Sequence, residues 1–272
     1  MLSKNTIKLV RSLQYKKFRL RERLFVAEGA KTVADLMTAF RAERVFISEE
    51  TEADRTDTQP FRRRLSKETD CTIITHDELQ RVSLLQHPQG VLALFRLPDD
   101  ENGAPVDEDG LTLALDGVQD PGNMGTIIRT ADWFGIRHVV CSRDSADAYA
   151  PKVVQATMGS LARVRVVYTD LVAFLAARRA GTPVYGTFLD GGNIFEEHLS
   201  DNGIIIMGNE GNGISDAVAR QVTHRLTIPR YSEHASKSGK VTGAESLNVA
   251  IATAVVCSEF RRAKRTMNGT YK

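Results

Sequence analysis

The sequence predicts an α/β protein with two domains, and three observations lead to this prediction. Short apolar segments alternate with segments whose apolar residues have helical spacing. One acidic stretch rich in proline and glycine interrupts the alternation. After it, strand segments such as "GIIIMG" are almost continuously apolar, which is typical of parallel strands covered on both faces. A length of 272 residues suits one or two domains.

The first part of the chain is predicted to form a small α/β domain. Apolar residues recur at helical spacing in "AKTVADLMTAF", and Asp77 is expected to cap a later helix. The expected helices are residues 7–13, 30–40, 58–69 and 77–85, and the expected strands are 23–29, 44–48, 71–76 and 90–97.

A linker is predicted where "PDDENGAPVDEDG" runs from Pro98 to Gly110, because this stretch contains almost nothing to bury. The predicted organisation is an N-terminal α/β domain over residues 1–98, a linker over 99–110 and a second domain over 111–272. The expected strands of the second domain are 111–117, 138–142, 163–168, 183–189, 203–208 and 225–229, and a long final helix begins near residue 246.

Composition narrows the class of protein. A net charge of +2, with 42% hydrophobic and 26% charged residues, is ordinary for a soluble globular chain. Cys71, Cys141 and Cys257 lie far apart, which argues against a disulfide framework, and no His/Cys spacing suggests a metal site. No segment has the apolar length of a signal peptide or a membrane span, so we expect a cytoplasmic protein without membrane contact.

Three loops follow predicted strands of the second domain, where open α/β sheets bind ligands. The first, "DPGNMG", leads into a helix whose apolar face leaves out Arg129. A helix cap would explain Asn123, and an exposed ion pair with Asp132 would explain Arg129. The alternative is that Arg129 points into an active site.

The other two loops are also ambiguous when each is taken alone. Glycines in "MGNEGNGIS" would let the backbone approach a ligand closely, but a plain strand-to-helix connection capped by Glu210 is an alternative. The third loop follows Pro229 and ends where Ser246 could cap the final helix.

In this order, "NMGTIIRTADWFG", "MGNEGNGIS" and "IP…SLNVAIATAV" resemble the SpoU (TrmH) branch of the SPOUT RNA methyltransferases over residues 111–262. The N-terminal part resembles the RNA-binding domain that often precedes this catalytic domain. The resemblance implies methyl transfer from S-adenosylmethionine to a ribose 2′-hydroxyl, with S-adenosylhomocysteine as product and no metal. It also implies a SPOUT-type parallel sheet with a deep trefoil knot, and a homodimer with active sites near the interface. Both rRNA and tRNA are substrates in the family, and the added domain favours rRNA by analogy.

The resemblance also assigns roles to residues. The implied catalytic residues are Asn123, Arg129, Glu210, Ser246 and Asn248, and the implied cofactor-binding residues are Met207, Gly208, Asn209, Gly213, Ile228, Pro229 and Leu247. The cofactor is expected to be gripped largely through backbone groups of Gly208, Ile228 and Leu247. The catalytic residues other than Arg129 are assigned to orienting that arginine, the substrate and the loops, with two of them, Ser246 and Asn248, next to the target ribose.

Arg129 is the residue that the chemistry needs most. A ribose hydroxyl is a poor nucleophile, so displacement at a sulfonium methyl requires alignment and stabilisation of developing alkoxide charge. A guanidinium can supply that charge and bind an adjacent phosphate. A role as general base is the alternative, but guanidinium stays protonated in proteins. Arg129→Lys is therefore expected to lose most turnover and little cofactor affinity.

A basic cluster near the N-terminus is the candidate RNA-binding site, because Lys and Arg contacts to phosphate dominate nucleic-acid affinity. Its members are Lys16, Lys17, Arg19, Arg21 and Arg23. The alternative is a solvated charged face.

A second candidate for RNA contact is the segment 230–245, which is longer than the usual family loop and carries Lys237 and Lys240. It is interpreted equally well as an RNA-contacting lid or as a tolerated surface insertion.

Two other functions compete with methyl transfer. A non-catalytic RNA-binding protein could use the same scaffold, although all five implied catalytic residues are present. A nucleotide-binding α/β enzyme could use the "GNEGNG" loop, but the Walker lysine and the Rossmann acidic partner are missing.

Overall fold

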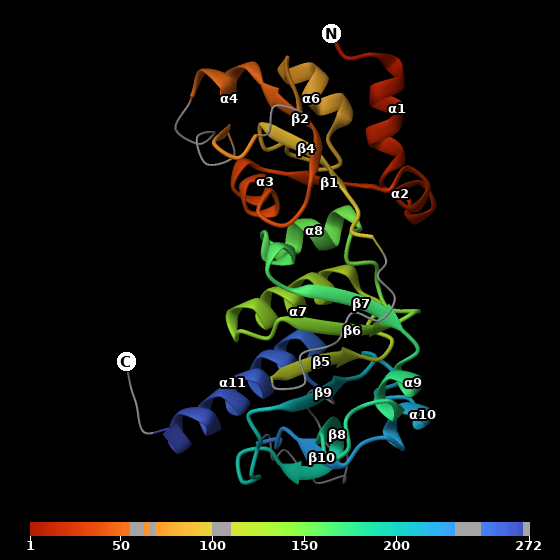
Figure 1. Ribbon diagram of the computed structural model, residues 1–272, viewed down its shortest axis with the longest axis vertical. Helices are drawn as coiled ribbons and strands as arrows, with labels where there is room; N and C mark the ends of the chain where they lie inside the picture. The colour runs from red at the N-terminus through yellow and green to blue at the C-terminus, as the bar shows by residue number, and fades with distance from the viewer. Residues whose placement is uncertain (55–61, 66–68, 100–109, 232–245, 269–272) are drawn as a thin grey trace, which may run out of the picture. The chain divides into compact units, whose positions relative to one another are not determined.

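The computed structural model describes the chain except residues 55–61, 66–68, 100–109, 232–245 and 269–272. The described chain forms two compact units (Figure 1). The first contains Met1–Ala104 with Asp147–Arg163, and the second contains Pro105–Ala146 with Val164–Lys272. Almost all of the predicted linker, and part of the helix predicted at 58–69, lie outside the described residues.

The first unit is built on a four-stranded sheet in the order β1-β4-β2-β3. Strand β4 pairs antiparallel with β1 and β2, whereas β2 and β3 are parallel. The strands are β1 Leu24–Glu28, β2 Ala42–Ser48, β3 Asp70–Ile74 and β4 Val91–Arg96, at the four positions predicted.

Helices cover this sheet. The helices are α1 Lys4–Ser12, α2 Lys16–Glu22, α3 Ala30–Leu36, α4 Glu49–Ala53, α6 His76–Val82 and α8 Pro151–Thr157, the last contributed by the later segment of the unit. Helices α1 and α6 pack against each other, and Val10, Leu79 and Leu94 are buried in the core beneath them. The expected cap of α6 was wrong. Thr75 caps this helix in a reciprocal capping box with Glu78, and Asp77 lies inside the first turn.

The second unit is a six-stranded, all-parallel sheet in the order β10-β8-β9-β5-β6-β7. All six predicted strands are present, which confirms the α/β prediction. They are β5 Leu111–Leu115, β6 His138–Ser142, β7 Arg165–Thr169, β8 Val184–Asn193, β9 Gly203–Met207 and β10 His224–Thr227. Strand β8 runs four residues beyond its predicted end at 189.

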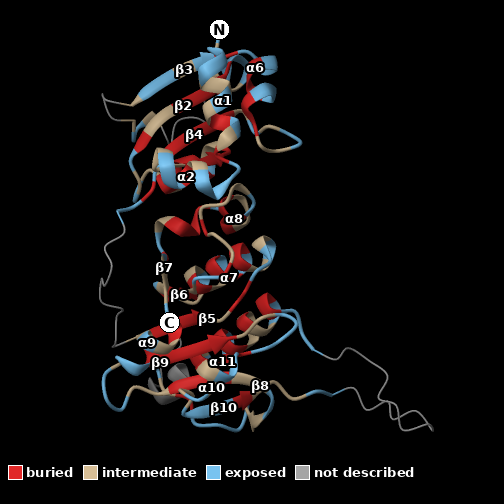
Figure 2. Cartoon of the chain, turned by 90° about the vertical axis from the view of Figure 1, so that its right-hand side faces the viewer, coloured by how far each residue is buried: buried red, intermediate tan, exposed pale blue. Residues whose placement is uncertain are grey.

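Helices lie on both faces of this sheet, as Figure 1 shows. The pair α7 Pro121–Trp133 and α11 Val249–Asn268 packs together, as does the pair α9 Leu171–Ala176 and α10 Asp216–Ala219. Because both faces are covered, successive residues of β9 such as Ile204, Ile205 and Ile206 are all buried (Figure 2). This double coverage explains the continuous apolar strand sequences.

The strand order creates a switch point beside β5. Strands β6 and β7 extend the sheet on one side of β5, whereas β9 pairs with its other side. Ligands of open α/β sheets bind outside the carboxyl ends of strands at such a point. In the described residues no helix has the length and apolarity needed to cross a membrane.

The connection between β10 and α11 includes residues 232–245, which the structure does not describe. The trefoil knot implied by the family resemblance therefore stays a prediction.

Candidate active site

The three predicted loops lie at the carboxyl ends of β5, β9 and β10, all on one edge of the parallel sheet. Strands β5 and β9 are hydrogen-bonded neighbours, with Leu115 opposite Met207. Sheet geometry thus brings together loops that are about ninety residues apart in the chain.

Helix α7 begins earlier than the capping interpretation of Asn123 requires. Asp120 is the N-cap, and its Oδ1 accepts a hydrogen bond from the Asn123 backbone N–H at 2.7 Å. Pro121 occupies the first helical position, where its missing N–H does no harm. Because Asp120 satisfies the helix end, the Asn123 side chain is available for another partner.

That side chain joins the three loops. Asn123 Nδ2 donates to Glu210 Oε1 at 2.9 Å, and Asn123 Oδ1 accepts from Asn248 Nδ2 at 2.9 Å. The structure therefore brings three of the five predicted catalytic residues into one hydrogen-bonded chain.

The direction of this chain is fixed at α11. Asn248 Oδ1 accepts from the backbone N–H groups of Ala250 at 2.9 Å and Ile251 at 3.3 Å. Its amide nitrogen must therefore face Asn123, whose own nitrogen must face Glu210. Asn248, and not Ser246, caps this helix, so the capping interpretation of Ser246 was wrong. Ser246 is exposed beside it.

The glycine-rich loop after β9 is closed by its own backbone. Asn209 and Gly213 exchange two N–H···O bonds of 2.9 Å, and Asn209 Nδ2 donates to the Gly117 carbonyl at 2.7 Å. A Cβ at Gly208 would lie 2.3 Å from the Gly213 carbonyl carbon, so a side chain does not fit there. Gly213 has φ +68°, which favours glycine.

Arg129 lies on the exposed side of α7, opposite the buried Ile127 and Ile128, as predicted. Its guanidinium forms no hydrogen bond or ion pair within the described part of the chain, so the exposed pair with Asp132 is not formed. It does not contact Asn123 or Glu210 either. A cation in this state is available to an anionic ligand.

Residues of the predicted cofactor site offer accessible backbone and apolar surface. The N–H and C=O groups of Gly208, Ile228 and Leu247 have no hydrogen-bond partner among the described residues. The Leu247 side chain is 51% exposed, whereas Met207 is buried and Pro229 is half-buried. Unused backbone donors and acceptors are the groups that could bind a purine nucleoside such as that of S-adenosylmethionine.

Two supporting residues were missed by the sequence analysis. Asp116 Oδ2 accepts from the Ser215 backbone N–H at 2.7 Å, and Ser142 Oγ accepts from the Gly117 N–H at 2.8 Å. Asp116 directly follows β5 and Ser142 ends β6. Polar residues at the carboxyl ends of parallel strands were the signal that could have found them.

The basic cluster is divided by the structure. Lys16, Lys17 and Arg21 are exposed on α2 and Arg23 is half-buried. Arg19 is 2% exposed, so its assignment to RNA contact was wrong.

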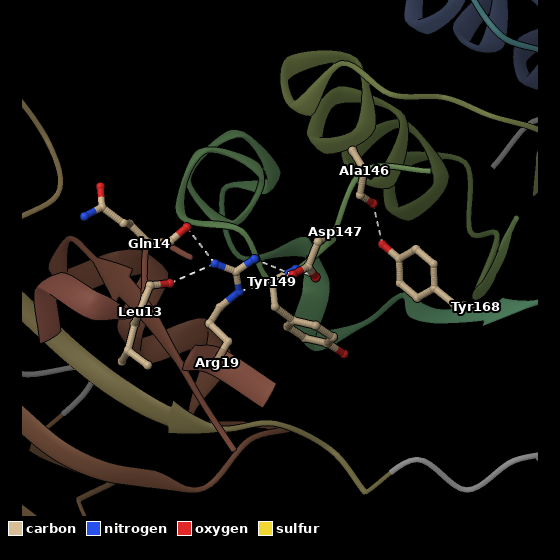
Figure 3. A network of polar contacts seen from close by, with 7 residues as sticks. All are labelled: Leu13, Gln14, Arg19, Ala146, Asp147, Tyr149 and Tyr168. Atoms are coloured by element: carbon tan, nitrogen blue, oxygen red, sulfur yellow. Dashed lines mark hydrogen bonds and ion pairs between the residues drawn. The ribbon is translucent and has the colours of Figure 1, made fainter. Parts of the chain in front are cut away.

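Figure 3 shows what Arg19 does instead. Its Nη1 donates to the carbonyls of Leu13 at 2.8 Å and Gln14 at 2.9 Å, and the guanidinium forms an ion pair with Asp147. A buried guanidinium with these partners stabilises the turn between α1 and α2 and is closed to RNA.

The segment predicted as a lid or surface insertion, with Lys237 and Lys240, falls at 232–245 outside the described residues.

Two family models match different parts of the chain. Residues 110–258 match the SpoU rRNA Methylase family, and residues 4–93 match the MRM3-like substrate binding domain. The chain is 30% identical over 254 residues to the 23S rRNA (guanosine(2553)-2′-O)-methyltransferase RlmP of Bacillus subtilis, covering 92% of this chain and 94% of that protein.

Solved structures of TrmH-family and SpoU proteins are similar to this chain over almost its whole length. A TrmH-family protein from Porphyromonas gingivalis is 43% identical with a TM-score of 0.82, covering 96% of this chain and 99% of that one. The SpoU methyltransferase AviRb from Streptomyces viridochromogenes, in complex with AdoMet, is 25% identical with a TM-score of 0.81, covering 96% and 98%. The chain is therefore a member of the SpoU rRNA methylase family, with an MRM3-like substrate-binding domain at its N-terminus.

Proposed function

We propose that this protein transfers a methyl group from S-adenosylmethionine to a ribose 2′-hydroxyl of ribosomal RNA. The observation that carries the proposal is the Glu210–Asn123–Asn248 chain, which ties three loops together at the switch point of the parallel sheet. A non-catalytic RNA-binding protein would have no need to hold these polar side chains in a fixed order.

Different residues are assigned to cofactor binding, to alignment of the reactants and to stabilisation of charge. S-adenosylmethionine supplies an electrophilic methyl group when bound, and backbone groups of Gly208, Ile228 and Leu247 would hold it. The hydrogen-bonded chain keeps the loops at fixed positions, so that the 2′-hydroxyl can be aligned with the methyl group. Arg129 stabilises the negative charge that develops on the ribose oxygen and binds a neighbouring phosphate.

Ribosomal RNA is the favoured substrate class. The Bacillus subtilis relative is named as a 23S rRNA methyltransferase, and a Streptomyces viridochromogenes relative, 32% identical over 184 residues, is named as a 23S rRNA (uridine(2479)-2′-O)-methyltransferase. The N-terminal domain, residues 1–98, would bind the RNA and the domain after the linker would modify it.

A homodimer is part of the proposal, because one chain does not present Asn123 and Arg129 on the same side of α7. Six residues separate them, which places them about 120° apart around a helix with 3.6 residues per turn. A second copy packed against α7 and α11 would supply its Arg129 to the loops of the first. Trp133 is 84% exposed on α7 and Ile251 54% exposed on α11, and they offer apolar surface for such packing.

The deciding experiment is transfer of a labelled methyl group from S-adenosylmethionine to total rRNA and tRNA. Wild type, Arg129→Ala and Arg129→Lys are compared, and the product is mapped as alkali-resistant ribose. Arg220, an exposed arginine at the C-cap of α10, provides the control variant Arg220→Ala. We expect transfer to rRNA by wild type and the control, and its loss in both Arg129 variants.

Binding of S-adenosylhomocysteine, measured by thermal shift, is expected to survive in all variants. Transfer that persists in Arg129→Ala would contradict the assigned role. Binding of RNA and cofactor without transfer to any RNA, including ribosomal assembly intermediates, would favour the non-catalytic alternative.

A further inference from the structure

We propose that α2 and its N-cap form a binding surface for unpaired nucleotides of RNA, on which the Tyr15 ring stacks a base. The surface, here called the basic-aromatic surface, consists of Tyr15, Lys16, Lys17, Phe18 and Arg21. The inference rests on the proposed function in taking RNA as the ligand. It adds that the N-terminal domain binds a single-stranded segment, not a duplex.

Charge is concentrated in this part of the chain. The first 23 residues carry eight Lys or Arg and one acidic residue, Glu22, so their net charge is +7. The whole chain has a net charge of +2, so the other residues together are net −5. Of these eight cations, Arg19 is buried against Asp147, Arg21 pairs with Glu22 and Arg23 pairs with Asp99. Such an excess of positive charge in one segment, when the rest of the chain is net negative, indicates a polyanionic partner.

Aromatic rings lie among these cations. Tyr15, at the N-cap of α2, is 55% exposed, and its side chain makes no cap hydrogen bond. The Phe18 ring lies 6.3 Å from it, centroid to centroid, with a tilt of 59°. Lys17 Nζ is 4.9 Å and Arg21 Cζ is 4.7 Å from the Phe18 centroid.

An exposed ring flanked by cations suits single strands better than duplexes. Bases in a single strand can stack on aromatic side chains while the cations bind the adjoining phosphates. In an RNA duplex the base faces are already stacked, so recognition would rely on the shape of the duplex and on its phosphates and 2′-hydroxyls. An exposed tyrosine would then contribute little.

The surface is held in shape from its buried side. The buried Arg19 side chain joins the carbonyls of Leu13 and Gln14 to Asp147 (Figure 3). The Tyr15 carbonyl also accepts from the N–H groups of Phe18 at 3.0 Å and Arg19 at 3.2 Å. A ring presented on such a fixed turn loses little conformational entropy when a base stacks on it.

The experiment measures RNA binding by the full-length chain, apart from methyl transfer. The probe is a single strand of about ten nucleotides with one 2-aminopurine, used alone or annealed to its complement. Tyr15→Leu removes the aromatic ring but keeps an apolar side chain, and Tyr15→Phe keeps the ring. Lys17→Gln tests the phosphate contact, and Lys31→Gln, at an exposed lysine of α3 in the same unit, is its control.

We expect Tyr15→Leu to weaken single-strand binding about ten-fold and to abolish quenching of 2-aminopurine, with duplex binding unchanged. Tyr15→Phe should bind within about two-fold of wild type. Lys17→Gln should weaken binding of both the single strand and the duplex, and should reduce the slope of log affinity against log salt concentration by about one. Lys31→Gln should change neither quantity.

Equal loss of single-strand and duplex binding in Tyr15→Leu would overturn the proposal, as would binding equal to wild type. Unchanged RNA binding with lost binding to anionic lipid vesicles would assign the surface to membranes and overturn it as well. These readouts do not need methyl transfer, so a failure of the proposed activity would leave the test of this surface intact. Thermal unfolding confirms that each variant is folded.

Discussion

Asn123 Nδ2 lies 2.9 Å from Glu210 Oε1, and this hydrogen bond joins the first turn of α7 to the loop after β9. Glu210 acts here as an acceptor. Glu210→Gln keeps an acceptor oxygen for Asn123, whereas Glu210→Ala removes it. We expect the glutamine variant to retain methyl transfer within about three-fold and the alanine variant to lose about ten-fold or more, in line with one hydrogen bond of about 1 kcal/mol plus an unpaired amide.

The measurement is kcat and KM for RNA at saturating S-adenosylmethionine. A glutamine variant as impaired as the alanine variant would show that the negative charge itself is required and would contradict an orienting role.

Asn248 has two functions that substitution can separate. Asp is a good N-cap, so Asn248→Asp keeps the cap of α11 but replaces the donor to Asn123 with a carboxylate oxygen. We expect unchanged stability and a loss of methyl transfer of at least ten-fold. Asn248→Ala removes both the helix cap and the donor to Asn123. It should lose methyl transfer to the same extent, and its free energy of unfolding should fall by about 1 kcal/mol.

Urea unfolding and initial rates are measured for both variants. If Asn248→Asp were as active as wild type, the hydrogen bond to Asn123 would have no part in catalysis.

Subunit complementation tests the proposed homodimer. Arg129→Ala is expected to be inactive, and Glu210→Ala to keep at most about a tenth of the wild-type rate. In a mixed dimer, one active site combines Glu210 of one subunit with Arg129 of the other, and both are intact. Mixing the two variants under conditions of subunit exchange should therefore restore transfer to about a quarter of the wild-type rate, since about half of the dimers are mixed and each has one intact site.

The control is each variant mixed with itself. No recovery, with mixed dimers demonstrated by differential tagging, would place Arg129 and Glu210 in the same subunit's site.

Arg19 is expected to be a stability residue. Its side chain is 3% exposed and that of Asp147 16% exposed, so removal of the guanidinium leaves a largely buried carboxylate and two carbonyls without their donor. Arg19→Ala should lower the free energy of unfolding by about 3–5 kcal/mol. Arg21→Ala, at an exposed neighbour paired with Glu22, should lower it by less than about 1 kcal/mol.

Urea unfolding followed by circular dichroism distinguishes the two. Equal effects of the two variants would contradict the structural role of Arg19.

Stability should also depend on pH through Glu28. Burial raises the pKa of this carboxyl, and hydrogen bonds from Ser83 Oγ at 2.6 Å and the Leu84 N–H at 2.8 Å act in the opposite direction. Since the folded state has the higher pKa, it favours the protonated form. The stability associated with Glu28 is then fully present below the unfolded pKa and is lost as pH rises through the folded pKa.

Glu28→Gln removes this titration. Relative to wild type, the variant should become progressively more stable as pH rises from about 4, near the unfolded pKa of glutamate, until the pH has passed the raised folded pKa. The measurement is the free energy of unfolding against pH, and a difference that is constant over this range would exclude the effect.

Much of this protein is determined by its sequence. Strand segments such as "GIIIMG" are apolar at every position because both faces of the sheet are covered. The alternation of strand and helix segments located all six strands of the second unit. The exposed position of Arg129 followed from helical periodicity alone. The motif residues of the three loops could also be placed at strand ends without coordinates.

Tertiary structure alone decided which of these strand ends meet. Parallel strands have similar sequences whichever neighbour they pair with, so the order β10-β8-β9-β5-β6-β7 could not be deduced from them. That order makes β5 and β9 neighbours and brings Asn123 within reach of Glu210 and Asn248, 87 and 125 residues away.

Arg19 shows the same limit for a charge. Its neighbours in sequence are exposed lysines and arginines, but its partner Asp147 is 128 residues away and joins the first unit only in the folded chain. Whether a cation is buried depends on the free energy gained from such distant acceptors. The sequence around Arg19 does not specify those acceptors. Only the folded structure therefore distinguishes this buried arginine from the neighbouring cations that face solvent.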